Sequence, residues 1–335
     1  MLKNIIATAL VATIGFSATS EVNIYSHRHY DTDKQLYKMF EKNTGIKVNV
    51  VKAKANELMK RLEKEGKNSP ADILITSDAA RLYIAQQKDL LQTINSKVLN
   101  AAIPANLRQK DGYWYALTKR ARVIVYNKDK VSPSELSTYA ALTKPELKGK
   151  VLIRKANNIY NQSLLASMVA NDGEENAKAW AKAMVNNFAR TPKGSDRDQM
   201  KAVAANVGDV AVVNTYYVGK LLNSKKRTEV EVGKKMGVFF PNQNGNGTHI
   251  NISGAGVTKY SKNKENAVKL LEFLVSPKAQ SMYGKRNYEY PANQNVEPSD
   301  LLKSWGTFKE DTLALEELGA NNAKAVKIFN EVKWK

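Results

Sequence analysis

The chain has 335 residues, and its 52 lysines and arginines outnumber 32 aspartates and glutamates, for a formal net charge of +20. Such a charge can attract an anionic ligand, an anionic membrane or nucleic acid. The lysines are scattered, however, and between residues 42 and 67 they alternate with glutamates, as on solvated helix faces. We therefore do not expect nucleic-acid binding. The absence of cysteine excludes disulfides, thiolate metal sites, a cysteine nucleophile and a lipid-anchored cysteine.

The N-terminus has the pattern of a cleavable signal peptide. Lys3 is a short positive region, residues 5–16 are apolar but too few to span a bilayer, and residues 18–20 are small. A buried N-terminal helix is the alternative interpretation. No later segment approaches the roughly 20 apolar residues of a membrane-spanning helix. We expect residues 1–20 to be removed and a soluble chain to be exported, with the periplasm of a Gram-negative cell as the best fit.

The first part of the exported chain alternates strands with helices. Predicted strands cover residues 22–26, 46–51 and 70–75, and predicted helices cover residues 31–45 and 55–65. This order predicts parallel strands joined by right-handed crossovers. The apolar run at residues 73–75 is typical of a strand that is covered on both faces of the sheet.

The pattern changes after two further predicted strands and a loop-rich passage, and then a second alternating series begins. The two strands cover residues 113–117 and 121–126; the second series has strands at 150–153, 209–213 and 250–257 and helices at 164–170, 177–188 and 266–275. The length favours two domains. We expect an α/β protein of two lobes joined by strands near residues 118–123 and 249–257. The first lobe would comprise residues 21–118 plus about 249–292, and the second residues 119–248 plus about 293–335.

Three segments share one design, in which a strand runs into a helix start with tyrosine at the junction. These segments contain Tyr30, Tyr160, and the pair Tyr216 and Tyr217. Ligands of open α/β sheets bind beyond the carboxyl ends of the strands, where all three junctions would lie. Helix N-termini there supply free N–H groups and a positive dipole, which favour phenolate over phenol. We therefore expect the four tyrosines to converge.

Several phenols around one point indicate a hard, highly charged cation. A tyrosine normally keeps its proton up to about pH 10. A trivalent ion can displace that proton because the ion is the largest local charge, and ferric iron is the obvious candidate. The pattern alone fits equally well with ordinary half-buried tyrosines, because the chain has 15 of them.

The three histidines offer a second metal hypothesis. His27 and His29 would face the same side of a strand, and His249 would complete a zinc site. This signal is weak, and we favour the interpretation that His29 joins the tyrosine site while His27 faces elsewhere.

Charged residues offer further candidates. One of Arg120 and Arg122, on a crossing strand, would point into the cleft to hold an anion or balance phenolate charge, unless both face solvent. Asp72 and Asp78 are possible carboxylate ligands, although Asp72 is more typical of a turn or cap.

Enzyme signatures are missing from the sequence. We find no G-x-S-x-G elbow, no phosphate-binding G-x-x-x-x-G-K-[ST] loop and no H-E-x-x-H motif. This favours a binding protein without catalytic residues. Two rivals stay open: a binding protein for an organic ligand such as a polyamine, phosphonate or thiamine-like compound, and a zinc-dependent exported enzyme that uses the three histidines.

Six segments together resemble the bacterial periplasmic ferric-ion-binding proteins, the transferrin-like substrate-binding components of iron ABC transporters. They are NIYSHRHYDTD, PADILITSDAARL, ALTKRARVIVYNKDK, NNIYNQSLLASM, GDVAVVNTYYVGKL and HINISGAGVTKYS. The tyrosine pair after GDVAVVN is the most diagnostic, and NIYNQSL resembles the tyrosine-rich, anion-independent branch. The resemblance covers essentially the whole exported chain.

The resemblance implies a two-lobed type II periplasmic binding fold that closes on Fe(III). It assigns Tyr30, Tyr160, Tyr216 and Tyr217 as ligands, with His29 as a fifth. Tyr30 would come from the first lobe and the others from the second, and Arg28 or Arg122 would offset the excess phenolate charge. The implied partners are an inner-membrane permease and its ATPase, and the protein is expected to be a monomer.

The sequence departs from some relatives of this family at one point. Those relatives use a carboxylate ligand from the segment corresponding to residues 76–78, together with a bound anion. The additional tyrosine at position 160 makes a carboxylate ligand unnecessary here. We therefore expect that neither Asp78 nor an exogenous anion binds the metal.

Overall fold

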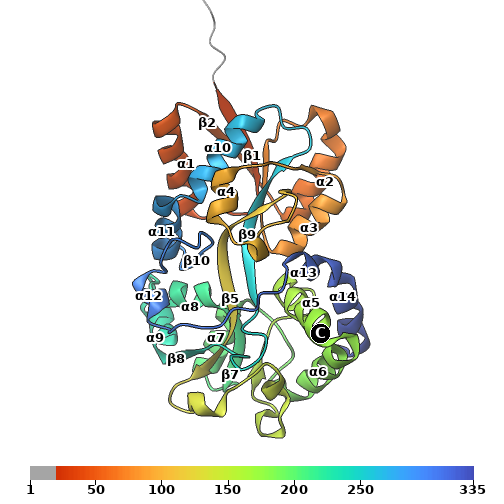
Figure 1. Ribbon diagram of the computed structural model, residues 1–335. Helices are drawn as coiled ribbons and strands as arrows, with labels where there is room; N and C mark the ends of the chain where they lie inside the picture. Colours follow the sequence, from red (N-terminus) through yellow and green to blue (C-terminus); the bar gives the residue numbers. More distant parts are fainter. Residues whose placement is uncertain (1–19) are drawn as a thin grey trace, which may run out of the picture.

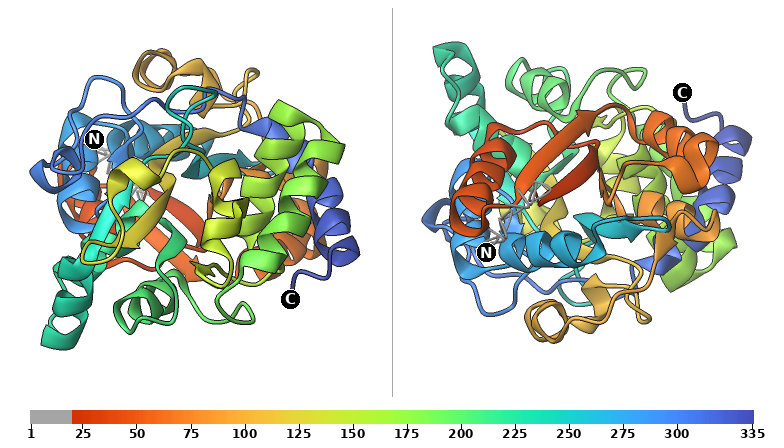
Figure 2. Two further views of the ribbon diagram at one scale, coloured as in Figure 1. Left: turned by 90° about the horizontal axis from the view of Figure 1, so that it is seen from below. Right: turned by 90° about the horizontal axis from the view of Figure 1, so that it is seen from above.

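The computed structural model describes residues 20–335, and the expected signal peptide lies outside these residues except for its last position. Figure 1 shows two α/β lobes connected by the long strands β5 (Tyr115–Asn127) and β9 (Ile250–Thr258). We call the lobe built on strands β1 to β3 the first lobe and the lobe built on β6 and β7 the second lobe. In both views of Figure 2 the strands lie inside and helices flank them on either side.

The first lobe is organised around strand β1, which pairs in parallel with β2 and with β3, as the alternating pattern predicts. Its elements are β1 (Glu21–Ser26), α1 (Asp31–Thr44), β2 (Lys47–Lys52), α2 (Ala55–Glu65), η1 (Gly66–Asn68), β3 (Ile73–Ser77), α3 (Ala79–Gln87), β4 (Leu91–Gln92), α4 (Lys97–Ala102), η2 (Ala105–Leu107), α10 (Lys264–Leu274), α11 (Pro277–Arg286) and β10 (Tyr290–Pro291). Helix α1 buries Leu36 and Phe40, four residues apart on one face, because helical spacing turns both toward the sheet.

The second lobe has parallel strands β6 and β7 at its centre. Between β5 and β9 the chain forms η3 (Pro133–Glu135), η4 (Ala140–Thr143), η5 (Pro145–Leu147), β6 (Val151–Leu152), α5 (Ile159–Asp172), α6 (Glu174–Asn187), α7 (Asp196–Ala204), β7 (Val210–Asn214), α8 (Thr215–Leu222), α9 (Arg227–Lys235) and β8 (Met236–Phe239). After β10 it forms α12 (Asp300–Lys303), α13 (Glu316–Ala320), which packs against both α3 and α5, and α14 (Asn322–Glu331). One face of β7 packs Val210 and Val212 against Leu164, Leu165 and Phe329. The apolar run of this strand is therefore explained by burial.

The two crossing strands belong to both lobes. The sheet order is β2-β1-β3-β9-β5-β7-β6, and β9 runs antiparallel to both β3 and β5. The two separate strands predicted at residues 113–117 and 121–126 are wrong, because β5 is one continuous strand. Its pairing with β9 shifts register between Ala116 and Thr118, and buried Arg120 interrupts the apolar pattern. Because of these two features, the alternation of apolar and polar residues does not predict one continuous strand.

Several helices lie outside the predicted pattern. Helix α7 begins at a capping box, in which the Ser195 Oγ accepts a hydrogen bond from the Asp198 N–H while the Asp198 carboxylate accepts one from the Ser195 N–H. This short signal marks a helix start even though the apolar spacing is weak.

Within residues 20–335, no helix combines the length and the apolar character needed to cross a membrane.

Candidate metal centre

The four candidate tyrosines all lie at the first turn of a helix. Tyr30 is the N-cap residue of α1, Tyr160 is the second residue of α5, and Tyr216 and Tyr217 are the second and third residues of α8. Free N–H groups and the positive end of the helix dipole are found at such positions. The chain thus reaches each tyrosine by the strand-to-helix route that the sequence predicts.

The structure brings these tyrosines together. The hydroxyl oxygens of Tyr160 and Tyr216 are 3.2 Å apart, and the ring centroids of Tyr216 and Tyr217 are 4.2 Å apart. Tyr30 approaches from α1, and the ammonium nitrogen of Lys220 lies 4.0 Å from its ring centroid and 5.0 Å from that of Tyr216. The neighbouring tyrosines of α8 therefore share one cluster with tyrosines from two other helices.

Burial keeps the phenols of Tyr30, Tyr216 and Tyr217 protonated by raising their pKa values. It raises the pKa of Tyr216 well above its usual value, and the nearby Tyr160 and Tyr217 raise it further. The pKa of Tyr30 is also raised, first by burial and then by the Glu289 carboxylate. For Tyr217, burial and the Tyr160 phenol likewise raise the pKa. A ligand that binds the phenolate forms must displace protons that the protein holds through the neutral range.

Three arginines surround the ring of Tyr160. The guanidinium carbons of Arg120, Arg154 and Arg122 lie 5.2 Å, 5.5 Å and 5.9 Å from its centroid. Arg120 and Arg122 are both buried, so the solvent-facing alternative is wrong. Arg122 donates hydrogen bonds of 2.8 Å to Asp196 and to Asn161. Arg154 was not predicted, because nothing in its local sequence distinguishes it from other surface arginines.

Arg120 has spare hydrogen-bonding capacity beside the tyrosines. Its Nη2 lies 3.4 Å from the Asp78 carboxylate, whereas its buried Nε and Nη1 have no hydrogen-bond partner among residues 20–335. Burial alone would lower the pKa of Arg120, but the charge of Asp78 and the phenols of Tyr160 and Tyr216 raise it above the usual value. Arg120 is therefore a permanent positive charge next to the cluster.

Two further basic residues lie near the tyrosines: Arg28, which the sequence predicts to balance phenolate charge, and Lys220, which was not predicted. They differ in whether a carboxylate pairs with their charge. Arg28 is buried and donates to both Asp33 and Glu289, so two carboxylates already engage its charge. No ion pair of the described chain involves Lys220, and burial lowers its pKa to about 8. Lys220 follows Tyr216 by four residues and Tyr217 by three, and this spacing places all three on one helix face. That spacing is the sequence signal that could have identified Lys220.

The histidines do not form the zinc site considered above. Residues 20–335 contain no group of three or more histidine, aspartate or glutamate side chains arranged to hold a metal ion. His249 is buried, and its pKa is lowered to about 3, chiefly by burial and then by two arginines. His27 is half-buried with its ring 3.4 Å from the carbonyl of Ala53. His29 is exposed, and its ring centroid lies 5.4 Å from that of Tyr30.

The two aspartates have structural partners. Asp78 caps helix α3 and is fully buried; its carboxylate accepts hydrogen bonds from Ser163 at 2.7 Å and from Asn251 at 2.9 Å. Asp72 accepts from the backbone N–H of Asn23 at 2.8 Å and from that of Asn263 at 2.9 Å. Asp72 is thus a turn and cap residue.

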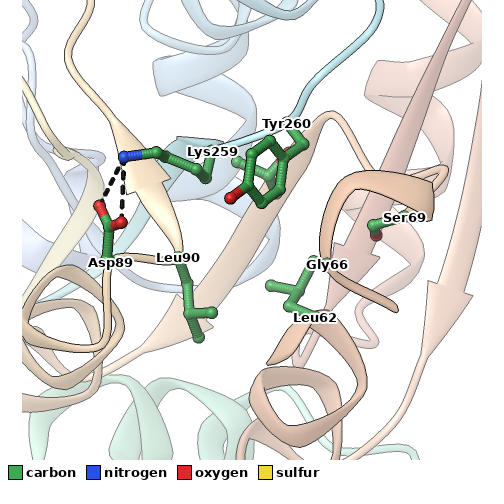
Figure 3. A pocket seen from close by; sticks show the side chains of 8 residues that line it. Leu62, Gly66, Ser69, Asp89, Leu90, Lys259 and Tyr260 are labelled. Carbon is green, nitrogen blue, oxygen red and sulfur yellow. Dashed lines mark hydrogen bonds and ion pairs between the residues drawn. The ribbon is translucent and has the colours of Figure 1, made fainter. Parts of the chain in front are cut away.

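A small cavity elsewhere in the first lobe has no room for a ligand. Figure 3 shows it between Leu62, Leu90 and Tyr260, beside the ion pair of Lys259 and Asp89. It lies where β3 begins, whereas Tyr30 follows the end of the parallel strand β1. Its volume of about 20 Å³ has room for about one water molecule.

Comparison with known proteins places the chain among binding proteins for solutes. The profile described as bacterial extracellular solute-binding protein matches residues 35–310. Iron uptake protein A1 of Synechocystis sp. is 51% identical to this chain, and the match covers 94% of this chain and 88% of that protein. The structure of a Trichodesmium protein, described as IdiA or FutA in complex with iron and citrate ligands, has a TM-score of 0.92 at 51% identity and covers 94% of this chain and 100% of its own.

A second solved structure agrees. The ferric binding protein from Campylobacter jejuni has a TM-score of 0.88 at 50% identity, and the match covers 94% of this chain and 100% of that one. The chain therefore has their two-lobed α/β fold and belongs to the bacterial extracellular solute-binding protein family.

Proposed function

We propose that this chain is a periplasmic protein that captures Fe(III) and delivers it to an ABC transporter. The convergence of tyrosines from three helix starts supports this proposal most directly. The names of two of its relatives, an iron uptake protein and a ferric binding protein, point in the same direction. Phenolate oxygens are hard donors, which suit a small trivalent ion better than a soft metal.

The proposed ligands are Tyr30, Tyr160, Tyr216 and Tyr217, with His29 as the fifth. His29 adjoins Tyr30 on the solvent side, where an imidazole can complete the coordination of an ion held by the phenols. Raised pKa values at Tyr30 and Tyr216 mean that binding releases protons. Only a strongly charged ion offsets the cost of releasing them.

The basic groups around the cluster balance the charge of the loaded site. Four phenolates around Fe³⁺ leave one unit of excess negative charge. We assign its compensation first to Lys220, which no carboxylate of residues 20–335 pairs with. Arg120 comes second, because its 3.4 Å contact with Asp78 leaves Nε and Nη1 free within the described chain, whereas buried carboxylates engage Arg28 at 3.0 Å and Arg122 at 2.8 Å. With the Asp78 carboxylate committed to Ser163 and Asn251, we propose that neither Asp78 nor an exogenous anion binds the iron.

The ligands would straddle the cleft between the lobes. We propose that the first lobe comprises residues 21–118 plus about 249–292, the second residues 119–248 plus about 293–335, and that β5 and β9 form the hinge. Tyr30 then belongs to the first lobe and the other three tyrosines to the second, so iron stabilises the closed form.

The physiological context follows from this assignment. The monomeric, iron-loaded closed form docks on an inner-membrane permease driven by an ATPase and has no catalytic activity of its own. Residues 1–20 direct export to the periplasm and are then removed. The membership of the chain in an extracellular solute-binding family supports this placement.

A visible absorption spectrum tests the iron assignment. The protein lacking residues 1–20 is recorded before and after ferric citrate, as wild type and as Tyr216→Phe/Tyr217→Phe, with Tyr260→Phe as control because that ring is 41% exposed. We expect a tyrosinate-to-iron charge-transfer band in the wild type and the control and its loss in the double variant. A colourless wild-type protein after iron addition would refute the assignment.

A further inference from the structure

A close contact joins the two lobes beside the tyrosine pair. Gly219 lies in α8, two residues after Tyr217, and Tyr288 lies in the first lobe between α11 and β10. A Cβ atom added at Gly219 would lie 2.5 Å from both the Cβ and the Cγ of Tyr288. Real Cβ atoms essentially never approach so closely. The side chain of Tyr288 therefore rests on helix backbone that has no room for even a methyl group.

The backbone at Tyr288 is held in an uncommon conformation. Its φ of 62° lies in the left-handed region, which non-glycine residues adopt rarely. Both neighbours are fixed to the first lobe: Glu289 accepts hydrogen bonds from Arg28 and from Thr118, and Asn287 accepts one from Thr32. Such a conformation persists only where the surroundings determine it. Tyr288 is thus presented to α8 by a rigid part of the first lobe.

The contact fixes the position of the helix that carries the tyrosine pair. Lys220, the residue after Gly219, reaches the ring of Tyr30 in the first lobe at 4.0 Å. Any displacement of α8 away from Tyr288 would therefore also separate Tyr216 and Tyr217 from Tyr30. Close packing transmits such a shift because interiors have few voids to absorb it.

We propose that Gly219 is a positioning residue: because it has no side chain, α8 can approach Tyr288 in the closed form, and this close approach sets the distance between α8 and Tyr30. This inference rests on the proposed function, because it assigns to the contact the geometry of the Fe(III) site. A side chain at position 219 would keep the lobes from closing fully. The metal would then lack part of its ligand set. Iron would then leave faster.

Three variants separate this role from a general effect on folding. Gly219→Ala introduces the methyl group, and alanine favours helix more than glycine does. Gly284→Ala is the matched control in helix α11, because a Cβ there would meet its nearest atoms at an ordinary 3.7 Å. In Gly219→Ala/Tyr288→Gly the obstructing side chain is removed, and glycine suits the positive φ at that position.

Two measurements follow closure and iron retention independently. Iron release is timed from the charge-transfer band after addition of excess hydroxamate chelator. Lobe separation is measured between spin labels at Lys64→Cys in α2 and Lys182→Cys in α6, both at exposed positions of a chain without other cysteines. We expect Gly219→Ala to release iron at least about 10-fold faster, since partial loss of positioning around a metal typically costs 10–100-fold. The label distance should lengthen.

The control and the double variant decide the outcome. Gly284→Ala should behave as wild type, and the double variant should regain most of the wild-type release rate and label distance. Wild-type behaviour of Gly219→Ala, or a double variant as impaired as the single one, would overturn the proposal. A wild-type protein that binds no iron would instead refute the proposed function. The label distances would then test the contact alone, because Gly219→Ala should still reduce the short-distance population.

Discussion

At the residue scale, the proposed function requires an ion to displace the protons of the clustered phenols before these groups can become ligands. Burial raises the pKa of Tyr216 and of Tyr30, and each neighbouring phenol adds to the cost of ionisation. A weakly charged cation therefore gains little from entering, whereas a trivalent ion recovers the cost through strong bonds to several phenolates. Under the proposed function, selectivity for a trivalent ion would thus arise from the clustering of the phenols.

Removal of one phenol should weaken iron binding strongly. Tyr216→Phe keeps the buried ring but loses the hydroxyl that lies 3.2 Å from that of Tyr160. We expect a loss of iron affinity of at least about 100-fold, above the range found for groups that only support a ligand. A competition titration against citrate measures it. The control Tyr25→Phe removes another buried, hydrogen-bonded phenol away from the site, and equal losses in both variants would contradict the ligand role of Tyr216.

Lys220 should contribute through its charge. At about 5 Å and an effective dielectric constant near 20, one unit of charge is worth about 3 kcal/mol before screening. We expect Lys220→Met to weaken iron binding by at least about 10-fold, with a smaller effect at high salt, and Lys220→Arg to retain most of the affinity. Undiminished affinity in Lys220→Met would show that the excess negative charge is balanced elsewhere, with Arg120 as the nearest candidate.

At the scale of elements, local signals predicted where the tyrosines lie, and tertiary packing decided what surrounds them. The strand-to-helix junctions could be found from sequence because capping residues and apolar periodicity are local. Arg154 could not be assigned to the site in this way, since its role depends on segments distant in the chain. For Lys220 the sequence offered only its place on the helix face of the tyrosine pair, and its contact with Tyr30 comes from a distant segment. The continuity of β5 was missed for a related reason: buried Arg120 looks polar until its partner Asp78 is known.

His249, the residue before the crossing strand β9, should make the stability of the fold depend on pH. Its pKa is about 3 in the folded protein against an ordinary value of 6.5, so the unfolded chain binds the extra proton between these values. This contribution is complete above pH 6.5 and is lost as the pH falls toward 3. Lowering the pH from 7 to 5 should reduce the free energy of unfolding by about 2 kcal/mol through this residue.

Denaturant titrations at both pH values measure this contribution as the difference between wild type and His249→Gln. The variant should show a smaller pH dependence, and His29→Gln, at an exposed position, should not. Identical pH dependence in wild type and His249→Gln would contradict the assignment of a buried neutral imidazole.

At the scale of the whole molecule, the proposed site would link three events: closure of the lobes, binding of the ion and release of protons. Lys220 of α8 lies 4.0 Å from the ring of Tyr30, and under the proposed assignment the complete ligand set would exist only when the lobes meet. The net charge of +20 does not by itself draw in a cation, and the clustered phenols must overcome it locally. The scattered lysines instead favour an anionic iron complex, such as a ferric chelate, as the form that approaches.

Iron affinity should fall steeply as the pH is lowered. Because the pKa values of Tyr30, Tyr216 and Tyr217 are raised, these phenols are protonated at every pH below neutrality, and each must lose its proton on binding. The affinity, corrected for the titration of the competing chelator, should therefore decrease by more than 10-fold per pH unit below 7. A decrease of 10-fold or less per pH unit would show that fewer than two of these phenols lose a proton on binding and would contradict the proposed ligand set.

The central claim is that Tyr30, Tyr160, Tyr216 and Tyr217 hold one ferric ion, and a crystal structure of the iron-loaded protein with anomalous data at the iron edge tests it most directly. We predict a single anomalous peak within bonding distance of all four phenolate oxygens, with His29 as the fifth ligand and Asp78 still bonded to Ser163 and Asn251. A peak bound by the Asp78 carboxylate, or one outside the tyrosine cluster, would contradict the account.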